Sequence, residues 1–143
     1  MTIREAQEKI IEEFEQYTEW EDRYKRIIEY GKQLPSFNEN LKTEKNKLSG
    51  CQSQVWITAH LEEGKIIFEA DSDASIVKGL IALIIQVYSN HTPEEILSNP
   101  PDYFRKIGID SHLSPTRKNG LAAMMKQIQM YAVAYKALLN KNS

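Results

Sequence analysis

The chain of 143 residues has a single cysteine, Cys51. One thiol cannot form a disulfide within the chain, and it cannot supply the several thiolates that structural zinc or an iron–sulfur cluster usually needs. The chain has no second cysteine that could react with an oxidised Cys51 to form a disulfide. Any chemistry at Cys51 must therefore involve a second molecule.

The chain also lacks a large charge of one sign and a long apolar run. Its 18 basic and 20 acidic residues leave a net charge of −2, without a basic stripe that could neutralise phosphates. Residues 1–14 alternate charged and apolar side chains, unlike a signal peptide or a membrane span. We expect a cytoplasmic protein with neither a nucleic-acid nor a membrane partner.

The length and the hydrophobic content of 41% are typical of one globular domain, expected to cover residues 1–143 without internal repeats. Thr2 with Glu5 forms a capping-box pattern before a predicted helix over 3–17. Thr18 with Glu21 repeats this pattern and predicts a second helix that ends before Leu34-Pro35. The two helices are predicted to form a hairpin.

Residues 54–60 and 65–70 are rich in strand formers and flank a Glu-Glu-Gly turn, which predicts a β-hairpin. Acidic and hydroxyl side chains at 71–73 are expected to cap the next helix, which is apolar almost all round over 76–87. Thr92-Pro93-Glu94-Glu95 predicts another helix start. The pattern indicates an α+β fold, with a small antiparallel sheet packed against several helices.

Cys51 follows Gly50 and precedes the polar Gln52, just before the first predicted strand, so the thiol is expected on a loop or strand edge. From the residues alone, a small, buried and inert cysteine is the commoner interpretation, and the function stays open. Lys45 and Lys47 can favour the thiolate, although solvated loop charges are the commoner role.

Three blocks resemble the SufE family of sulfur-acceptor proteins, and their order and spacing also match. The first is the uninterrupted segment from Gly50 to Trp56, GCQSQVW, around the only cysteine. The others are DSDA with IVKGL over 71–80, and LSPTR with NGL over 113–121. The segment from Trp20 to Pro35 is similar to the family's second helix, so the resemblance covers nearly the whole chain.

The resemblance implies a SufE/IscU-like fold and a helper of a pyridoxal-phosphate (PLP) cysteine desulfurase. Cys51 would receive sulfur from the desulfurase persulfide and pass it to an iron–sulfur scaffold complex, without a cofactor bound by this chain. Scaffolds of the IscU type carry several cluster-binding cysteines, so the single Cys51 excludes that role here. The resemblance leaves open which desulfurase is served and whether the chain forms a homodimer.

Other side chains carry weaker signals. Gly50, Gln52 and Arg117 are candidate partner-facing or loop-supporting residues, and a surface ion pair is an equally good role for Arg117. The histidines, His60, His91 and His112, are too scattered for a zinc site or a Cys–His dyad, so no metal is expected. A thiol hydrolase or peroxidase remains an alternative, but no general base stands at a recognisable spacing.

Overall fold

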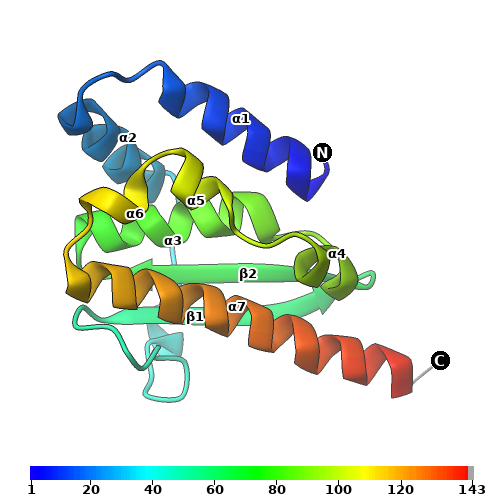
Figure 1. Cartoon of the computed structure of the whole chain (residues 1–143). Helices are drawn as coiled ribbons and strands as arrows, with labels where there is room; N and C mark the ends of the chain where they lie inside the picture. Colours follow the sequence, from blue (N-terminus) through cyan, green and yellow to red (C-terminus); the bar gives the residue numbers. More distant parts are fainter. Residues whose placement is uncertain (142–143) are drawn as a thin grey trace.

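The computed structural model describes residues 1–141 and confirms the α+β fold (Figure 1). A helical hairpin comes first, a β-hairpin follows, and further helices complete the chain. The elements are α1 (Ile3–Glu15), α2 (Trp20–Lys32), the short 3₁₀ helix η1 (Glu39–Leu41), β1 (Val55–Glu62), β2 (Lys65–Ser72), α3 (Ser75–Tyr88), α4 (Pro93–Ser98), α5 (Tyr103–Lys106), α6 (Ile109–His112) and α7 (Pro115–Lys141).

The helix α3 forms the centre of the molecule, between the α1–α2 hairpin and the two-stranded sheet (Figure 1). Its residues Ile81, Leu83 and Ile84 are completely buried, as the apolar run over 76–87 predicts. The helix α2 crosses α3 at Gly79, where an added Cβ would lie 2.1 Å from a backbone oxygen of α2. Although α3 is so apolar, no helix within residues 1–141 is long and apolar enough to cross a membrane.

The sheet is an antiparallel hairpin whose register runs from Val55 opposite Ser72 to Glu62 opposite Lys65. Glu63 and Gly64 form the turn, and both have positive φ, 52° and 79°. Such a turn matches the right-handed twist of the two strands. Alternate residues of β2 point into the core, so the sheet buries one face against the helices.

The helix α7 runs along the outer edge of β1 (Figure 1). The Tyr135 hydroxyl donates a hydrogen bond of 3.0 Å to the carbonyl oxygen of Ala59, and the Tyr131 hydroxyl lies 3.5 Å from that of Ile57. These carbonyls point away from β2. The tyrosines therefore occupy acceptors that the two-stranded sheet leaves without a strand partner.

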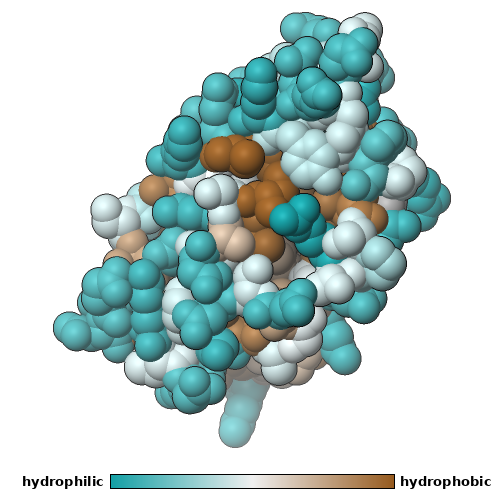
Figure 2. All heavy atoms as spheres, turned by 90° about the vertical axis from the view of Figure 1, so that its left-hand side faces the viewer, coloured by the Kyte–Doolittle hydropathy of each residue, from teal (hydrophilic) through white to brown (hydrophobic). Residues whose placement is uncertain are grey.

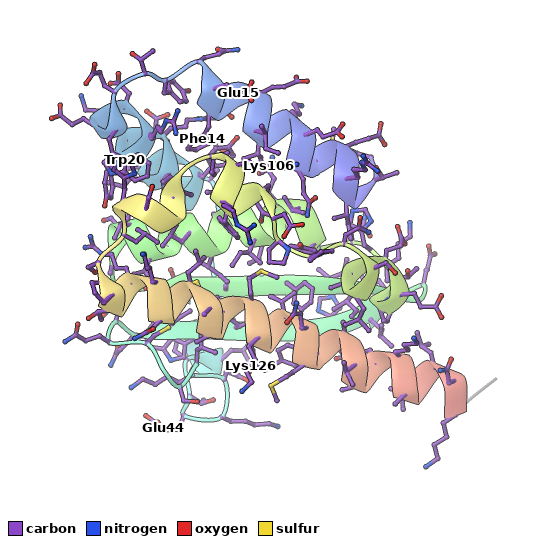
Figure 3. The ribbon with its side chains drawn as sticks, in the orientation of Figure 1. Phe14, Glu15, Trp20, Glu44, Lys106 and Lys126 are labelled. Carbon is purple, nitrogen blue, oxygen red and sulfur yellow. The ribbon has the colours of Figure 1, made fainter. Side chains whose placement is uncertain are left out.

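The contact between α1 and α2 combines an aromatic pair with an ionic one. Phe14, labelled in Figure 3, is completely buried and stacks on Tyr30 with the ring centroids 6.4 Å apart. Next to them, the Glu13 carboxylate accepts hydrogen bonds from the Tyr17 and Tyr30 hydroxyls and from the Arg26 guanidinium. This cluster ties the end of α1 to the middle of α2.

The helix-capping patterns of the sequence are confirmed in part. Thr2 and Thr92 form the expected capping boxes. The predicted cap at Thr18 is wrong, because α2 begins one residue later, after Glu19, and no side chain caps it. The short helix α6 was not predicted.

Candidate functional site

Cys51 lies on a six-residue loop, residues 49–54, that leads into β1. The loop is closed at its base because the Leu48 N–H donates to the Val55 carbonyl at 2.8 Å. One step further out, the Ile57 N–H donates to the Asn46 carbonyl at 3.0 Å. The strand-forming residues after Cys51 thus pair with the chain that precedes it, and the thiol is held on the connection between them.

The second end of the loop is fixed by the end of β2 and by the short link between β2 and α3. The Asp73 carboxylate accepts a hydrogen bond of 3.0 Å from the Gln54 N–H, and the Ser72 hydroxyl donates one of 2.7 Å to the Gln54 carbonyl. The prediction that residues 71–73 cap α3 is wrong. Its N-cap is Ala74, without a side-chain hydrogen bond. These polar residues hold the cysteine loop.

Asp71 joins three parts of the chain. Its carboxylate lies 2.9 Å from the Lys42 ammonium, which precedes the cysteine loop, and 3.2 Å from that of Lys78 on α3. Lys42 also lies over the Trp56 ring of β1, 5.1 Å from the centroid. Burial alone would raise the pKa of Asp71, but the hydrogen bonds from Lys42 and from the backbone outweigh this effect and lower it. Asp71 is therefore ionised, and it links the segment before the cysteine loop to α3.

The thiol of Cys51 is half-buried and faces the backbone of α7. Its S–H donates to the Gly120 carbonyl oxygen at 3.6 Å. A Cβ at Gly120 would lie 3.4 Å from the Cys51 sulfur. Gly50 has φ +89°, a conformation that other residues rarely adopt, and it turns the chain toward α7. Burial raises the pKa of Cys51, so the thiol is the resting form.

A pocket of about 380 Å³ opens beside Cys51. Figure 2 views the end of the molecule where this loop and the start of α7 lie, and apolar atoms show there among polar ones. Of the predicted site residues, Gln52 and Arg117 line the pocket with Cys51, whereas Gly50 does not. The other lining residues are Ser53, Val77, Leu80, Ser114, Thr116, Gly120 and Met124.

Arg117 is exposed, and its guanidinium makes no ion pair or hydrogen bond within the part of the chain that the structure describes. The surface ion pair that the sequence left open for it is therefore not formed. Lys45 and Lys47 do not line the pocket. A role of these lysines in favouring the thiolate stays a prediction.

The histidines stay apart from the thiol. His91 lies 3.3 Å from the carboxylate of Glu95, and the His112 ring stacks on Trp20 with the centroids 4.0 Å apart. Among the described residues, no group of histidine, cysteine and acidic side chains could hold a metal ion. The described lining of the pocket contains no histidine or carboxylate that could act as a general base.

Some residues of the site were missed by reasoning from the sequence. Met124 is buried in the core and also forms a wall of the pocket. The role of Gly120 was not predicted, although a glycine inside a helix signals close approach of another group. Val77 and Leu80 line the pocket from α3, whereas Val55 and Trp56, which follow the cysteine loop in the sequence, do not.

The model of the SufE family, described as an Fe-S metabolism associated domain, matches residues 8–132. The chain belongs to the SufE family. The resemblance in the three sequence blocks is thereby confirmed, and it places this protein in iron–sulfur metabolism.

Similar proteins agree with this assignment. An uncharacterized SufE-like protein of Synechocystis sp. is 43% identical over 127 residues, which cover 89% of this chain and 80% of the relative. One of Rhizobium meliloti is 42% identical over 130 residues, 87% of this chain and 93% of the relative. The solution structure of a hypothetical protein from Thermus thermophilus matches 92% of this chain and 96% of its own, with 23% identity and a TM-score of 0.76, which shows a shared fold.

Proposed function

We propose that this SufE-family protein accepts a sulfane sulfur on Cys51 from a PLP-dependent cysteine desulfurase, stimulates that enzyme, and passes the sulfur to an iron–sulfur scaffold complex. One observation carries the proposal: the only thiol of the chain lies on a loop at a pocket, in a domain associated with iron–sulfur metabolism. In this role the chain is a sulfur-transfer partner. PLP belongs to the desulfurase.

The transfer is a thiol exchange. The Cys51 thiolate attacks the outer sulfur of the desulfurase persulfide, a new S–S bond forms, and the old one breaks. The electron pair of the broken bond leaves with the desulfurase thiolate. Sulfane sulfur changes carrier without an external oxidant or reductant, and this chain does not have to break a carbon–sulfur bond.

The resting geometry protects the thiol, so the proposed transfer includes a movement of the loop. A half-buried thiol with a raised pKa reacts slowly, because the thiolate is the nucleophile. The hydrogen bonds at Leu48 and Gln54 hold the two ends of the loop, whereas Gly50 gives the backbone between them conformational freedom. Docking of the desulfurase would supply the free energy that exposes Cys51.

The alternative of a stand-alone thiol hydrolase or peroxidase has less support. Such an enzyme needs a base that takes the thiol proton, and the described pocket lining offers none. An inert, structural cysteine is disfavoured by the position of Cys51 at an open pocket. With a desulfurase as partner, this chain needs no base of its own for the Cys51 thiol, because docking can itself change the surroundings of the thiol.

The test is mass spectrometry of the protein after incubation with PLP-loaded desulfurase, copurified from the native cell, and cysteine. Cys51 should gain one sulfur atom, which a reductant removes. Cys51→Ser should fold with an unchanged thermal midpoint, gain no sulfur, and fail to stimulate the desulfurase, because a hydroxyl cannot hold a sulfane sulfur. Full stimulation by the serine variant would refute the acceptor mechanism.

A further inference from the structure

The pocket beside Cys51 is much larger than a persulfide requires. Its volume is about 380 Å³. The terminal sulfur of a persulfide is comparable in size with a water molecule, whose share of liquid volume is about 30 Å³. A persulfide on Cys51 would therefore leave most of the pocket free for a second group.

The lining of the pocket combines polar and apolar side chains. The polar ones include Gln52, three residues with hydroxyl groups, and Arg117, whose guanidinium lacks an ion pair or hydrogen bond within the described residues. The apolar ones include Met124 with its soft thioether. The hydroxyls belong to Ser53, Ser114 and Thr116, and the apolar side chains to Val77, Leu80 and Met124.

This combination of side chains suits a small anion that carries both hard oxygens and a soft sulfur. A planar guanidinium binds oxyanions through paired hydrogen bonds, and hydroxyl groups can donate further ones. A terminal sulfur has little affinity for such donors and fits better beside apolar side chains and Cys51. The nucleophile and the anion-binding groups thus line one cavity.

Resting on the proposed function, we propose that the pocket also binds a sulfur oxyanion with a terminal sulfane sulfur, of the class of thiosulfate, and that Cys51 takes sulfur from it directly. Arg117 would be the main binding residue for the oxygen end. The protein could then be loaded by a small molecule as well as by a desulfurase.

The step balances without a further reactant. The Cys51 thiol first releases its proton to solvent, which is slow without a base but is needed only once for each loaded protein molecule, unlike in a hydrolase or peroxidase that turns over. The thiolate attacks the outer sulfur of thiosulfate, the S–S bond of thiosulfate breaks, and its electron pair leaves with sulfite. The products are the Cys51 persulfide and sulfite, and the total charge of −3 on thiolate and thiosulfate is conserved.

The experiment mixes the reduced full-length protein with thiosulfate, without desulfurase. Sulfite release gives the rate, and mass spectrometry localises the added sulfur. The rate should saturate with thiosulfate. Arg117→Ala should lower the second-order rate constant of loading roughly tenfold to a hundredfold by raising the thiosulfate concentration at half-saturation, as expected for the loss of a charged hydrogen-bonding group. Arg117→Lys should be intermediate because it keeps the charge and loses the paired geometry.

The matched control is Lys118→Ala, because Lys118 is an exposed cation next to Arg117 that does not line this pocket. It should leave the thiosulfate rate unchanged, and Cys51→Ser should abolish it. Loading that does not saturate, or that Arg117→Ala leaves unchanged, would overturn the inference by indicating ordinary thiol exchange without a binding site.

The outcomes also separate this inference from the proposed function. Sulfur on Cys51 from the desulfurase but not from thiosulfate would overturn the small-molecule donor and leave the protein donor intact. Saturable loading from thiosulfate but not from the desulfurase would support the pocket and contradict the proposed partner. Loading from neither donor would overturn both.

Discussion

Ser72→Ala should make Cys51 react faster in the free protein. The Ser72 hydroxyl is buried and donates the 2.7 Å hydrogen bond to the Gln54 carbonyl at the end of the cysteine loop. Loss of the bond to Gln54 weakens the closed arrangement by about 1 kcal/mol. The variant also loses the longer bond of 3.3 Å that the Ser72 hydroxyl accepts from the Ala74 N–H, which does not involve the loop. If alkylation proceeds through an open loop, the open population and the rate should rise about fivefold.

The assay is the pseudo-first-order rate of Cys51 alkylation by iodoacetamide at fixed pH. Ser89→Ala is the matched control, because the Ser89 hydroxyl accepts a hydrogen bond of 2.9 Å from the Phe68 N–H at the opposite end of α3. Both variants should lower the thermal midpoint by about 3–5 °C. Only Ser72→Ala should accelerate alkylation. Equal rates in the two variants would refute the idea that the Gln54 contacts hold the loop closed.

Three further predictions address pH dependence and packing. The alkylation rate of free Cys51 should keep rising with pH beyond the ordinary thiol pKa of about 8.5, and added desulfurase should shift this profile to lower pH. Gly79→Ala should cost more than about 3 kcal/mol of stability by urea unfolding, because its Cβ would overlap a backbone oxygen of α2. For Glu13, burial would raise the pKa, but hydrogen bonds from Tyr30 and Arg26 lower it. Its stabilisation is therefore present above the unfolded value of about 4.3 and is lost as the pH falls below it, so the stability gap to Glu13→Gln should shrink in acid.

Features that depend on neighbouring residues could be predicted from the sequence. The capping boxes at Thr2 and Thr92 involve side chains three residues apart, so the local pattern contains the whole interaction. The β-hairpin and the buried helix α3 follow from strand propensity and apolar periodicity in the same way. Thr18 shows the limit, because the same local pattern is present there and the helix begins beyond it.

The site depends on contacts between distant segments, which periodicity does not contain. Asp73 has the composition of a helix cap, but the fold brings Gln54 within hydrogen-bonding distance, and Asp73 binds that backbone. Arg117 and Gly120 reach Cys51 only because α7 lies beside the loop. The family blocks identified these segments as important, and the tertiary structure shows which of their atoms meet.

The two tyrosines of α7 also bear on self-association. A sheet of two strands has an exposed edge, and such edges recruit strands from other molecules. Tyr131 and Tyr135 place hydroxyl groups at the carbonyls of Ile57 and Ala59, where an incoming chain would have to donate its own N–H groups. The last helix therefore occupies two acceptors that strand pairing between molecules would use. A truncation before Tyr131 would keep the pocket wall at Gly120 and Met124 and the pairing of residues 46–48 with the start of β1, but the carbonyls of Ile57 and Ala59 would lose their tyrosine donors and become available to a strand of another molecule.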